Sequence, residues 1–341
     1  MTVPSFEDKL LQRAVQMVLE PLYEQDFLDC SYGFRPGRSA HDALQALWDG
    51  TMRMGGGWII DLDIRKFFDT LDHAHLREIL KRRVSDGVLL RLIGKWLNAG
   101  VLEDGGVSYP ERGTPQGGVI SPMLSNIYLH EVLDKWFANE VKPSLKGEGF
   151  LIRFADDAVL VFARKEDAKQ VMDALPERFG KYGLTVHPEK TRLIRFGKPR
   201  KREGGTQEPP RWEKLNFLGF THYWGRSRKG NWVVLRKTES SRFTRALKKI
   251  AEWCKRNRHK PLGEQQRALA QKLRGHYAYY GITGNFRCLN SFLWEVQTVW
   301  RKWLERRTRG HRLTWERFSR LLQRYPLPAA RVVHSCYAAK L

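Results

Sequence analysis

Three aspartates in strongly apolar surroundings are the residues of this sequence best suited to chemistry. Asp63 lies near the end of an apolar run at 58–64, and Asp156 and Asp157 separate two further apolar runs. If these runs are neighbouring strands, the three carboxylates converge at one edge of a sheet. Oxygen ligands of this kind suit Mg²⁺, and a pair of such ions suits the in-line displacement of a phosphoryl group.

Two adjacent aspartates also have a plainer interpretation, because a solvated turn often carries such a pair. Here, however, the pair is flanked by Phe154 and by the apolar residues 159–161. An unpaired charge in such a setting is costly unless something neutralises it. We therefore expect a cation site, with one ion activating an attacking hydroxyl and the other stabilising the leaving group.

The elements that must position these carboxylates are predicted from apolar spacing and turn residues. Strands are expected over 58–64, 150–154 and 158–163, followed by short strands near 193–196, 216–220 and 232–235. Helices are expected over 5–29, 39–49, 73–99, 121–139 and 165–182, with a loop or hairpin at 101–114 and helices almost throughout from Ser240 onward. This order predicts an α+β fold in which a hairpin carries the Asp156/Asp157 pair at or beside its tip.

Positive charge is concentrated in the C-terminal part of the chain. The net charge of the 341 residues is +23, but residues 1–197 hold 26 lysines and arginines against 28 acidic residues, and residues 198–341 hold 34 against 9. A solvated protein surface normally carries positive and negative charges side by side. The imbalance therefore indicates a near-neutral catalytic part joined to a part that binds a polyanion such as a nucleic acid.

Signals for export, membrane insertion and cysteine chemistry are missing from the sequence. No apolar run reaches about 18 residues, and the first ten residues have neither the basic start nor the apolar stretch of a signal peptide. Cys30, Cys254, Cys288 and Cys336 lie far apart without CxxC spacing, which argues against a disulfide framework and against a zinc site. We expect a cytoplasmic protein with reduced thiols, no disulfide partner and no membrane contact.

Six short blocks occur in the order of the motifs of reverse transcriptases. They are residues 32–41 (YGFRPGRSAH), 63–69 (DIRKFFD), 113–122 (GTPQGGVISP), 153–158 (RFADDA), 183–190 (GLTVHPEK) and 216–220 (NFLGF). A seventh block, residues 273–280 (LRGHYAYY), is similar to the maturase-specific thumb, or X domain, of group II intron proteins. Over nearly its whole length the chain thus resembles a bacterial group II intron reverse transcriptase/maturase.

The resemblance implies a right-hand polymerase with fingers, a palm and an α-helical thumb. The implied domains are fingers at 1–57 and 83–113, palm at 58–82 and 114–238 with a basic loop at 198–210, and thumb or maturase X domain at 239–341. The N-terminus is expected to be short, without the usual template-gripping extension. No HNH-type endonuclease is expected after the X domain, since no Cys or His cluster follows it.

By the same resemblance, Asp63, Asp156 and Asp157 are the catalytic ligands of two Mg²⁺ ions, for which Mn²⁺ can substitute. Phe68 matches the ring that lies beneath the incoming sugar, where it would clash with a 2′-hydroxyl. Phe67 belongs to the same nucleotide-binding segment and is expected to contribute mainly to the core.

Four further residues are implied for binding the incoming nucleotide. Gln116 matches a residue that contacts the nucleotide, and the two glycines after it allow the close backbone approach that such a contact needs. Arg35 and Arg38 lie where cations grip the triphosphate, and the sequence does not choose between them. Lys190 matches a lysine near the pyrophosphate, where it would act as a general acid.

The basic C-terminal part interleaves cations with aromatic residues, a mixture that suits structured RNA or a template-primer duplex. The residues predicted to bind nucleic acid are Arg236, Lys237, Arg242, Arg245, Lys248, Lys249, Arg274, Arg301, Lys302, Arg306 and Arg307. Trp294 and Trp300 recur at helical spacing with apolar neighbours. They are therefore predicted to form the thumb core rather than to stack on bases.

The activity implied by the resemblance is that of an RNA-directed DNA polymerase that binds group II intron RNA, assists its splicing and copies it into DNA during retrohoming. Its partners would be the intron RNA, an RNA template with a DNA primer, and dNTPs. Two alternatives stay open: a splicing maturase without polymerase activity, and a domesticated reverse transcriptase of a defence system. Phe154 replaces the usual Tyr of the family, a change that keeps the ring and is expected to preserve activity. The cognate intron and the oligomeric state stay open as well.

Overall fold

The computed structural model describes residues 5–98, 101–103, 106–108, 113, 118–198, 213–307 and 313–335. The chain forms two compact units, Met1–Leu218 and Gly219–Leu341. Each unit has its own hydrophobic core.

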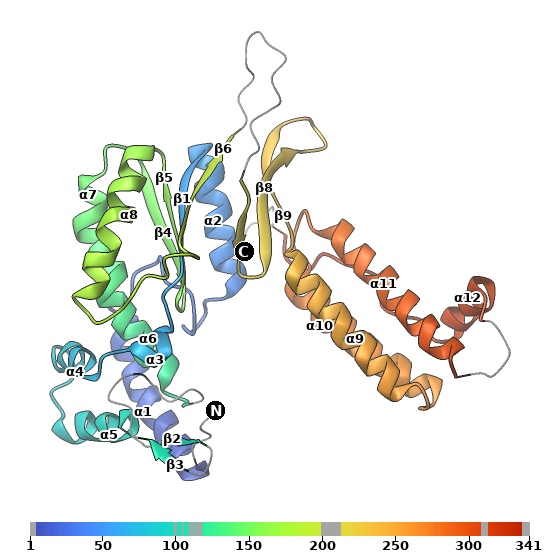
Figure 1. Cartoon of the computed structure of the whole chain (residues 1–341), viewed down its shortest axis with the longest axis horizontal. Helices are drawn as coiled ribbons and strands as arrows, with labels where there is room; N and C mark the ends of the chain where they lie inside the picture. The colour runs from blue at the N-terminus through green and yellow to red at the C-terminus, as the bar shows by residue number, and fades with distance from the viewer. Residues whose placement is uncertain are drawn as a thin grey trace, which may run out of the picture. The chain divides into compact units, whose positions relative to one another are not determined.

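The first unit is built on a four-stranded antiparallel sheet (Figure 1). Its strands, in spatial order, are β4 (Gly149–Phe154), β5 (Asp157–Phe162), β1 (Gly56–Leu62) and β6 (Arg192–Gly197). In the pairing of β1 with β5, Trp58 lies opposite Phe162 and Leu62 lies opposite Ala158. The end of β1 therefore lies beside the start of β5, which confirms that the predicted strands are neighbours.

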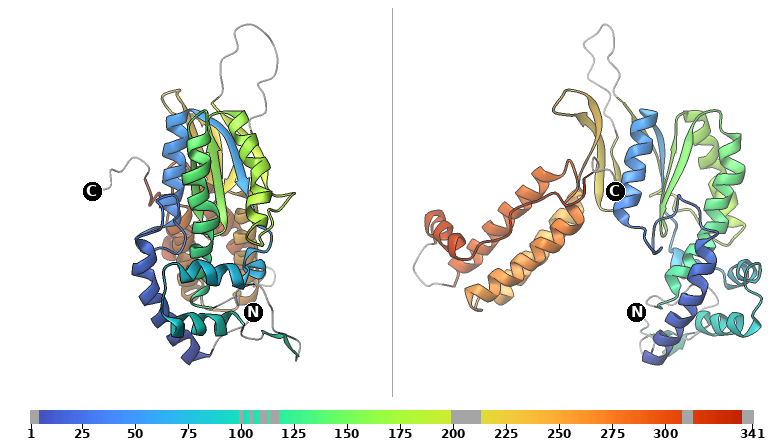
Figure 2. Two further views of the ribbon diagram at one scale, coloured as in Figure 1. Left: turned by 90° about the vertical axis from the view of Figure 1, so that its left-hand side faces the viewer. Right: turned by 180° about the vertical axis from the view of Figure 1, so that it is seen from behind.

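Strand β5 lies at the centre of this core, because residues 159–162 are each 0% exposed. A continuous apolar run is typical of a strand that is covered on both faces. Helix α2 (Ala40–Met54) covers one face of the sheet, and α8 (Lys165–Gly180) together with the helical segment 121–144 covers the other (Figures 1 and 2). Helix α2 begins at a capping box formed by Ser39 and Asp42.

Residues 121–144 form one nearly continuous helix that contains two π-helical segments. Its parts are α6 (Ser121–Leu129), η1 (His130–Asp134), η2 (Phe137–Val141) and α7 (Lys142–Ser144). The prediction ended this helix at 139. A π-helical turn is rare and often occurs at functional sites, and η1 carries the fully buried Asp134.

The first unit also contains shorter elements outside this sheet. They are α1 (Phe6–Glu24), α3 (Phe67–Thr70), α4 (His73–Lys81), α5 (Gly87–Leu97), β2 (Val101–Glu103), β3 (Gly106–Ser108) and β7 (Leu215–Phe217). The region predicted to be helical over 73–99 consists of two helices, because Asp86 starts the second one by accepting hydrogen bonds from the amides of Val88 and Leu89. Strands β2 and β3 pair with each other, which confirms a hairpin within 101–114.

The second unit combines one β-hairpin with helices (Figure 1). The hairpin consists of β8 (Phe220–Arg226) and β9 (Trp232–Thr238), and the helices are α9 (Ser240–Asn257), α10 (Leu262–Tyr280), α11 (Phe286–Glu305) and α12 (Trp315–Arg324). Phe292, Trp300 and Phe318 are at most 1% exposed, which confirms Trp300 as a core residue. Because the hairpin belongs to this unit, the unit begins before the predicted thumb boundary at 239, and the limits of fingers, palm and thumb stay predictions.

Within the described ranges, each helix is too short or too polar to cross a membrane. Cys30, Cys254 and Cys288 are free cysteines. Cys336 lies outside the described residues.

Candidate active site

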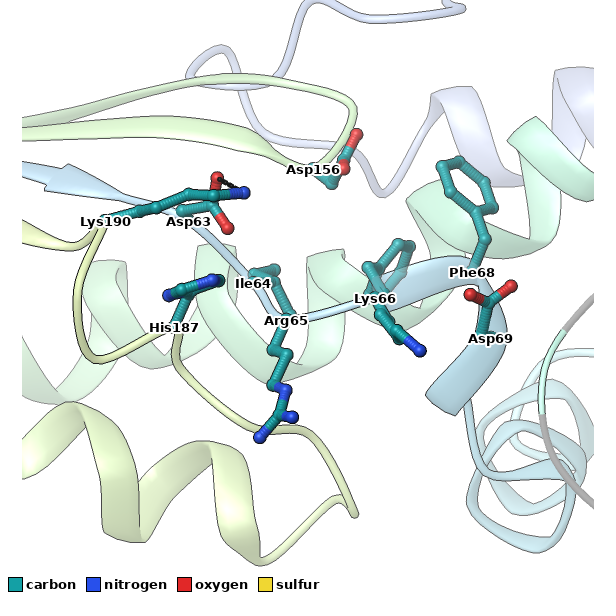
Figure 3. A pocket seen from close by; sticks show the side chains of 10 residues that line it. Asp63, Ile64, Arg65, Lys66, Phe68, Asp69, Asp156, His187 and Lys190 are labelled. Atoms are coloured by element: carbon teal, nitrogen blue, oxygen red, sulfur yellow. Dashed lines mark hydrogen bonds and ion pairs between the residues drawn. The ribbon is translucent and has the colours of Figure 1, made fainter.

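A cavity of about 420 Å³ lies where the chain leaves β1 (Figure 3). The residues that line it are Asp63, Ile64, Arg65, Lys66, Phe67, Phe68, Asp69, Asp156, His187 and Lys190. Three segments far apart in sequence therefore meet at one opening: the chain after β1, the turn between β4 and β5, and the loop before β6. Five of the predicted site residues come together here, namely Asp63, Phe67, Phe68, Asp156 and Lys190.

Backbone contacts with the loop before β6 fix the position of Asp63. The amide of His187 donates to the carbonyl of Asp63 (2.8 Å), and the amide of Asp63 donates to Thr191 Oγ1 (3.2 Å). The carboxylate is left at the cavity, where Lys190 Nζ lies 3.5 Å from Asp63 Oδ2 (Figure 3). The Lys190 side chain is 62% exposed, so this ion pair is weak and easily exchanged for another ligand.

The tight turn between β4 and β5 presents Asp156. Phe154 pairs with Asp157 across the hairpin, so Ala155 and Asp156 form its two-residue loop. Two-residue hairpin loops favour a positive φ at their first central position. Ala155 has a φ of 56°, which is a strained conformation for a residue other than glycine. The hairpin therefore places a strained residue directly before the carboxylate that it presents.

The electrostatic environment of the two carboxylates favours a cation between them. The pKa of Asp156 is raised, chiefly by burial and further by the negative charge of Asp63. A backbone hydrogen bond and the charge of Arg153 oppose this rise. A bound cation would offset the repulsion between the carboxylates and favour their charged forms.

The expected convergence of three aspartates is corrected to a pair. Asp157 is the exposed first residue of β5 and is not among the residues that line the cavity. Asp156 lies in the turn, whereas Asp157 already pairs with Phe154 in the hairpin. In the part of the chain that the structure describes, no three His, Cys, Asp or Glu side chains gather closely enough to hold a metal by themselves. A cation here would therefore need further ligands, from water or from a substrate.

The two adjacent phenylalanines have different environments. Phe67 is 2% exposed and belongs to the core, as expected. Phe68 is partly buried, borders the cavity and packs edge-on against Phe67, with 5.3 Å between ring centroids (Figure 3). Gln116, the other predicted nucleotide contact of this group, lies outside the described residues.

Arg35 and Arg38 also differ, and the structure corrects the role expected for Arg35. The Arg35 guanidinium is buried and donates to the Glu24 carboxylate and to two backbone carbonyls over 2.7 to 3.1 Å. Arg35 thus fixes its own loop and is not free to grip a triphosphate. The Arg38 side chain is 32% exposed and pairs with the exposed Asp29, so it is the more accessible of the two cations.

Most of the predicted nucleic-acid-binding cations are exposed on helices, or at a helix end, in the second unit. The exposed ones are Arg242, Arg245, Lys248, Lys249, Arg274, Lys302, Arg306 and Arg307. Lys237 and Arg301 are partly buried against aromatic rings. The prediction for Arg236 is wrong: it is 1% exposed, because the alternation of β9 places it on the buried side with Val234 and Thr238.

The prediction that Trp294 belongs to the thumb core is also wrong. Its side chain is 55% exposed, whereas Trp300 is 0% exposed. Six residues along an α-helix bring a side chain round to a direction about 120° away, so the two indoles point to different sides. The apolar spacing was correct for Trp300 alone.

Four polar residues that line the cavity were not predicted: Arg65, Lys66, Asp69 and His187. Their position inside the blocks 63–69 and 183–190 was the signal that could have identified them. Lys66 has a φ of 46° and is the N-cap of α3. This backbone turn directly precedes the pair in which Phe67 enters the core and Phe68 borders the cavity.

The arrangement of an antiparallel sheet with paired carboxylates at its edge belongs to an α+β polymerase fold. In agreement, the family model described as "Reverse transcriptase (RNA-dependent DNA polymerase)" matches residues 1–222. Because this match covers more than half of the chain, the chain belongs to the reverse transcriptase family.

The chain has similar relatives among known proteins, one of which is encoded by a group II intron. The group II intron-encoded protein LtrA of Lactococcus lactis subsp. cremoris is 45% identical over 135 residues, which are 39% of this chain and 22% of LtrA. Protein YkfC of Escherichia coli (strain K12) is 32% identical over 231 residues, with 56% of this chain and 58% of YkfC covered. The chain is thus similar to these proteins, and it spans less than two thirds of the length of either relative.

A solved structure supports the same fold. The apo telomerase from Candida tropicalis is similar with a TM-score of 0.50 and 14% sequence identity, over 92% of this chain and 56% of the telomerase chain. At this level of identity the likeness concerns the fold alone. It agrees with the predicted α+β polymerase architecture.

Proposed function

We propose that this chain is an RNA-directed DNA polymerase that also binds group II intron RNA, aids its splicing and copies it into DNA during retrohoming. Its substrates would be dNTPs and an RNA template paired with a DNA primer, in the cytoplasm of a bacterial host. The observation that carries the proposal is the pair Asp63 and Asp156, which faces a single cavity together with Phe68 and Lys190.

The donor set of the cavity fits a divalent cation that prefers oxygen ligands. Asp63 and Asp156 would hold it, since Mg²⁺ is usually bound by one or two carboxylates together with substrate phosphates. When bound, two Mg²⁺ or Mn²⁺ ions supply the charge neutralisation that nucleotidyl transfer requires. Burial and, after it, the charge of Asp63 raise the pKa of Asp156, so the charged form of this carboxylate is disfavoured. A bound cation would offset this effect.

The other residues at the cavity can then be given roles toward a nucleotide. Phe68 would exclude a 2′-hydroxyl beneath the sugar. Lys190, exposed and close to Asp63, would hold a proton for the leaving pyrophosphate. The exposed Arg65 and Lys66 would attract the triphosphate before it binds.

The charge of the second unit supports the RNA-binding part of the proposal. Residues 219–341 contain 28 lysines and arginines, six glutamates and no aspartate, a net charge of +22. Neutralisation of RNA phosphates by such a surface releases counterions and favours binding. The exposed cations of α9 would form part of this surface.

Primer extension on poly(rA)/oligo(dT) tests the proposal. The wild-type chain should extend the primer with Mg²⁺ and not in excess chelator. Asp156→Ala should lower the rate by about a hundredfold or more, as loss of an electrostatic group at the reacting phosphate does. Asp173→Ala is the matched control, because Asp173 is an exposed aspartate on α8 outside the cavity.

Two outcomes would contradict the polymerase proposal. One is extension in chelator at the rate seen with Mg²⁺, and the other is an Asp156→Ala variant that is as active as Asp173→Ala. A wild-type chain that binds intron RNA tightly but never extends a primer would instead establish a splicing maturase without polymerase activity.

A further inference from the structure

A buried polar network lies against the turn that presents Asp156. The side chains of Arg153 in β4 and Asp134 in η1 are both 0% exposed. Arg153 Nε and Nη2 donate to the two carboxylate oxygens of Asp134 over 2.7 and 2.6 Å. Arg153 Nη1 donates to the carbonyl of Ala155 (3.0 Å), which belongs to the turn itself.

The same network reaches the loop that contains Gly33. Asn126 Oδ1 accepts a hydrogen bond from Arg153 Nη1 (2.9 Å), and Asn126 Nδ2 donates to the carbonyl of Gly33 (2.7 Å). A Cβ atom added to Gly33 would lie 2.3 Å from the backbone nitrogen of Ala155. The Gly33 loop is therefore packed directly onto the turn, and only glycine allows this approach.

Stability alone is a weak reason for such a network. Desolvation of a buried ion pair offsets much of its attraction, so an apolar pair of similar size would often be as stable. A fully hydrogen-bonded buried network does, however, fix one arrangement of the groups that it contacts. The strained φ of Ala155 needs surroundings of this kind, because strain persists only where neighbouring structure enforces it.

We infer that Asp134, Arg153, Asn126 and Gly33 are positioning residues, which hold the Ala155–Asp156 turn so that Asp156 stays at the cavity that Asp63 also lines. They act through the turn and do not touch a substrate. The inference rests on the proposed polymerase function, because it concerns the placement of a proposed metal ligand.

Two tight glycines provide a matched test. Gly33→Ala should push the turn and lower kcat by about a hundredfold, as a displacement of about 1 Å in an active site does, with a nearly unchanged KM for dTTP. Gly50→Ala is the control: Gly50 is also buried, but its added Cβ would meet the ring of Phe150 (2.5 Å) at the opposite end of β4. Asn126→Ala, which leaves the Arg153–Asp134 pair intact, should lower kcat by about tenfold.

Activity is to be measured well below the melting midpoint of each variant, together with Mn²⁺ affinity by electron paramagnetic resonance. Weaker Mn²⁺ binding by Gly33→Ala and Asn126→Ala, but not by Gly50→Ala, supports the inference. Equal kcat and equal Mn²⁺ affinity in folded Gly33→Ala and Gly50→Ala would overturn it. If Gly33→Ala does not fold, wild-type kcat and Mn²⁺ affinity in Asn126→Ala would overturn it. A wild-type chain that does not extend primers contradicts the proposed function, and the Mn²⁺ affinities then still decide the inference.

A second inference concerns a pair of stacked tryptophans in the second unit. Trp294 of α11 and Trp315 of α12 stack with 4.8 Å between ring centroids and 10° between planes. Their side chains are 55% and 38% exposed. The Arg301 guanidinium lies over the ring of Trp315 at 4.5 Å, and Arg301 Nη1 donates to the carbonyl of Leu313 (2.7 Å) just before α12. Arg301 thus supports the Trp315 side of the stack, while the side chain of Trp294 is largely exposed.

We propose that Trp294 is a stacking platform for an unpaired RNA base. An indole offers a flat surface to any base, and the surrounding unit of net charge +22 favours a polyanion over an apolar protein surface. Arg287 is exposed on α11, and because it lies seven positions before Trp294 it is on the same helix face. Its charge can meet the backbone phosphate beside a stacked base. The platform rests on the proposed RNA binding and specifies where an unpaired segment would be held.

Binding of labelled oligo(U) RNA and of a blunt RNA duplex by the full chain tests the platform. Trp294→Ala should weaken oligo(U) binding by about tenfold, with little change for the duplex and an unchanged salt dependence, because no phosphate contact is lost. Trp294→Phe should keep most of the affinity. Phe286→Ala is the matched control, since Phe286 is 51% exposed on the same helix and lies outside the stack.

The platform would be overturned by wild-type oligo(U) affinity in Trp294→Ala, or by an equal loss in Phe286→Ala. A dimer that Trp294→Ala converts to monomer would overturn it as well, because the indoles would then pack against protein. A wild-type chain that binds neither RNA contradicts the proposed RNA binding together with the platform.

Discussion

At the scale of single residues, the proposed function depends on two carboxylates from distant parts of the chain. Asp63 and Asp156 line one cavity. The ion pair of Asp63 with the exposed Lys190 is too weak to neutralise the pair. The residue types and their apolar neighbours were sufficient to predict this meeting. They were not sufficient to separate Asp156 from Asp157, because the turn that orients the two depends on a positive φ at Ala155, and alanine gives no signal for that conformation.

The prediction at this scale concerns Phe68 and the selection of dNTPs over ribonucleotides. Phe68→Val should raise ribonucleotide incorporation on the order of tenfold or more relative to dNTPs, because a smaller side chain leaves room for a 2′-hydroxyl. The ratio of kcat/KM for rUTP and dTTP on poly(rA)/oligo(dT) measures this selectivity. Phe67→Val should lower stability through the core without changing selectivity. Unchanged selectivity in Phe68→Val would remove Phe68 from this role.

At the scale of elements, the β4–β5 hairpin and its pairing with β1 were predictable, because their apolar runs are long and end at turn residues. Side-chain direction was harder to predict. The resemblance implied that Arg35 grips a triphosphate and the charge pattern suggested that Arg236 binds nucleic acid, yet Arg35 is buried and Arg236 faces the buried side of β9. The π-helical segments η1 and η2 lie within a helix that apolar spacing predicted, but no local sequence signal marks them as π-helical.

The packing of α10 on α11 leads to a prediction about pH. His276 stacks on Phe292 with 3.8 Å between ring centroids, and burial lowers the pKa of His276 from 6.5 to about 4. Its pKa is lower in the folded chain than in the unfolded chain, so its contribution to stability is complete above pH 6.5 and is lost as the pH falls toward 4.

Urea unfolding of the full chain should therefore show a loss on the order of 2 kcal/mol at pH 5 from this residue. His276→Phe should reduce the difference in stability between pH 7.5 and pH 5. His259→Phe, a change at an exposed histidine, should leave that difference as in the wild type. An equal pH dependence in all three proteins would contradict the burial of a neutral His276.

At the scale of the whole molecule, charge divides the chain into a nearly neutral part and a strongly basic one. The sequence alone showed this division, because charge counts do not depend on the fold. The fold adds which of these cations are exposed. Arg242, Arg245, Lys248 and Lys249 lie exposed along α9, whose apolar side packs in the core of the second unit.

Replacement of Lys248 and Lys249 by Ala should weaken RNA binding and reduce the salt dependence of its affinity. Each lost phosphate contact should lower the slope of log K against log salt by about 0.7 to 0.9. Replacement of Lys142 and Lys169, two exposed lysines of the first unit, is the matched control and should change the slope less. Equal slopes in the two double variants would show that α9 does not contact RNA phosphates.

The central claim is that Asp63 and Asp156 together hold divalent ions, and the number of bound Mn²⁺ ions tests it most directly. Electron paramagnetic resonance on the full chain, with a chain-terminated DNA primer on an RNA template and the next dNTP, measures this number. We predict two bound Mn²⁺ ions in the wild type and in Asp173→Asn, and fewer in Asp63→Asn and in Asp156→Asn. Equal numbers of bound ions in all four proteins would contradict the claim.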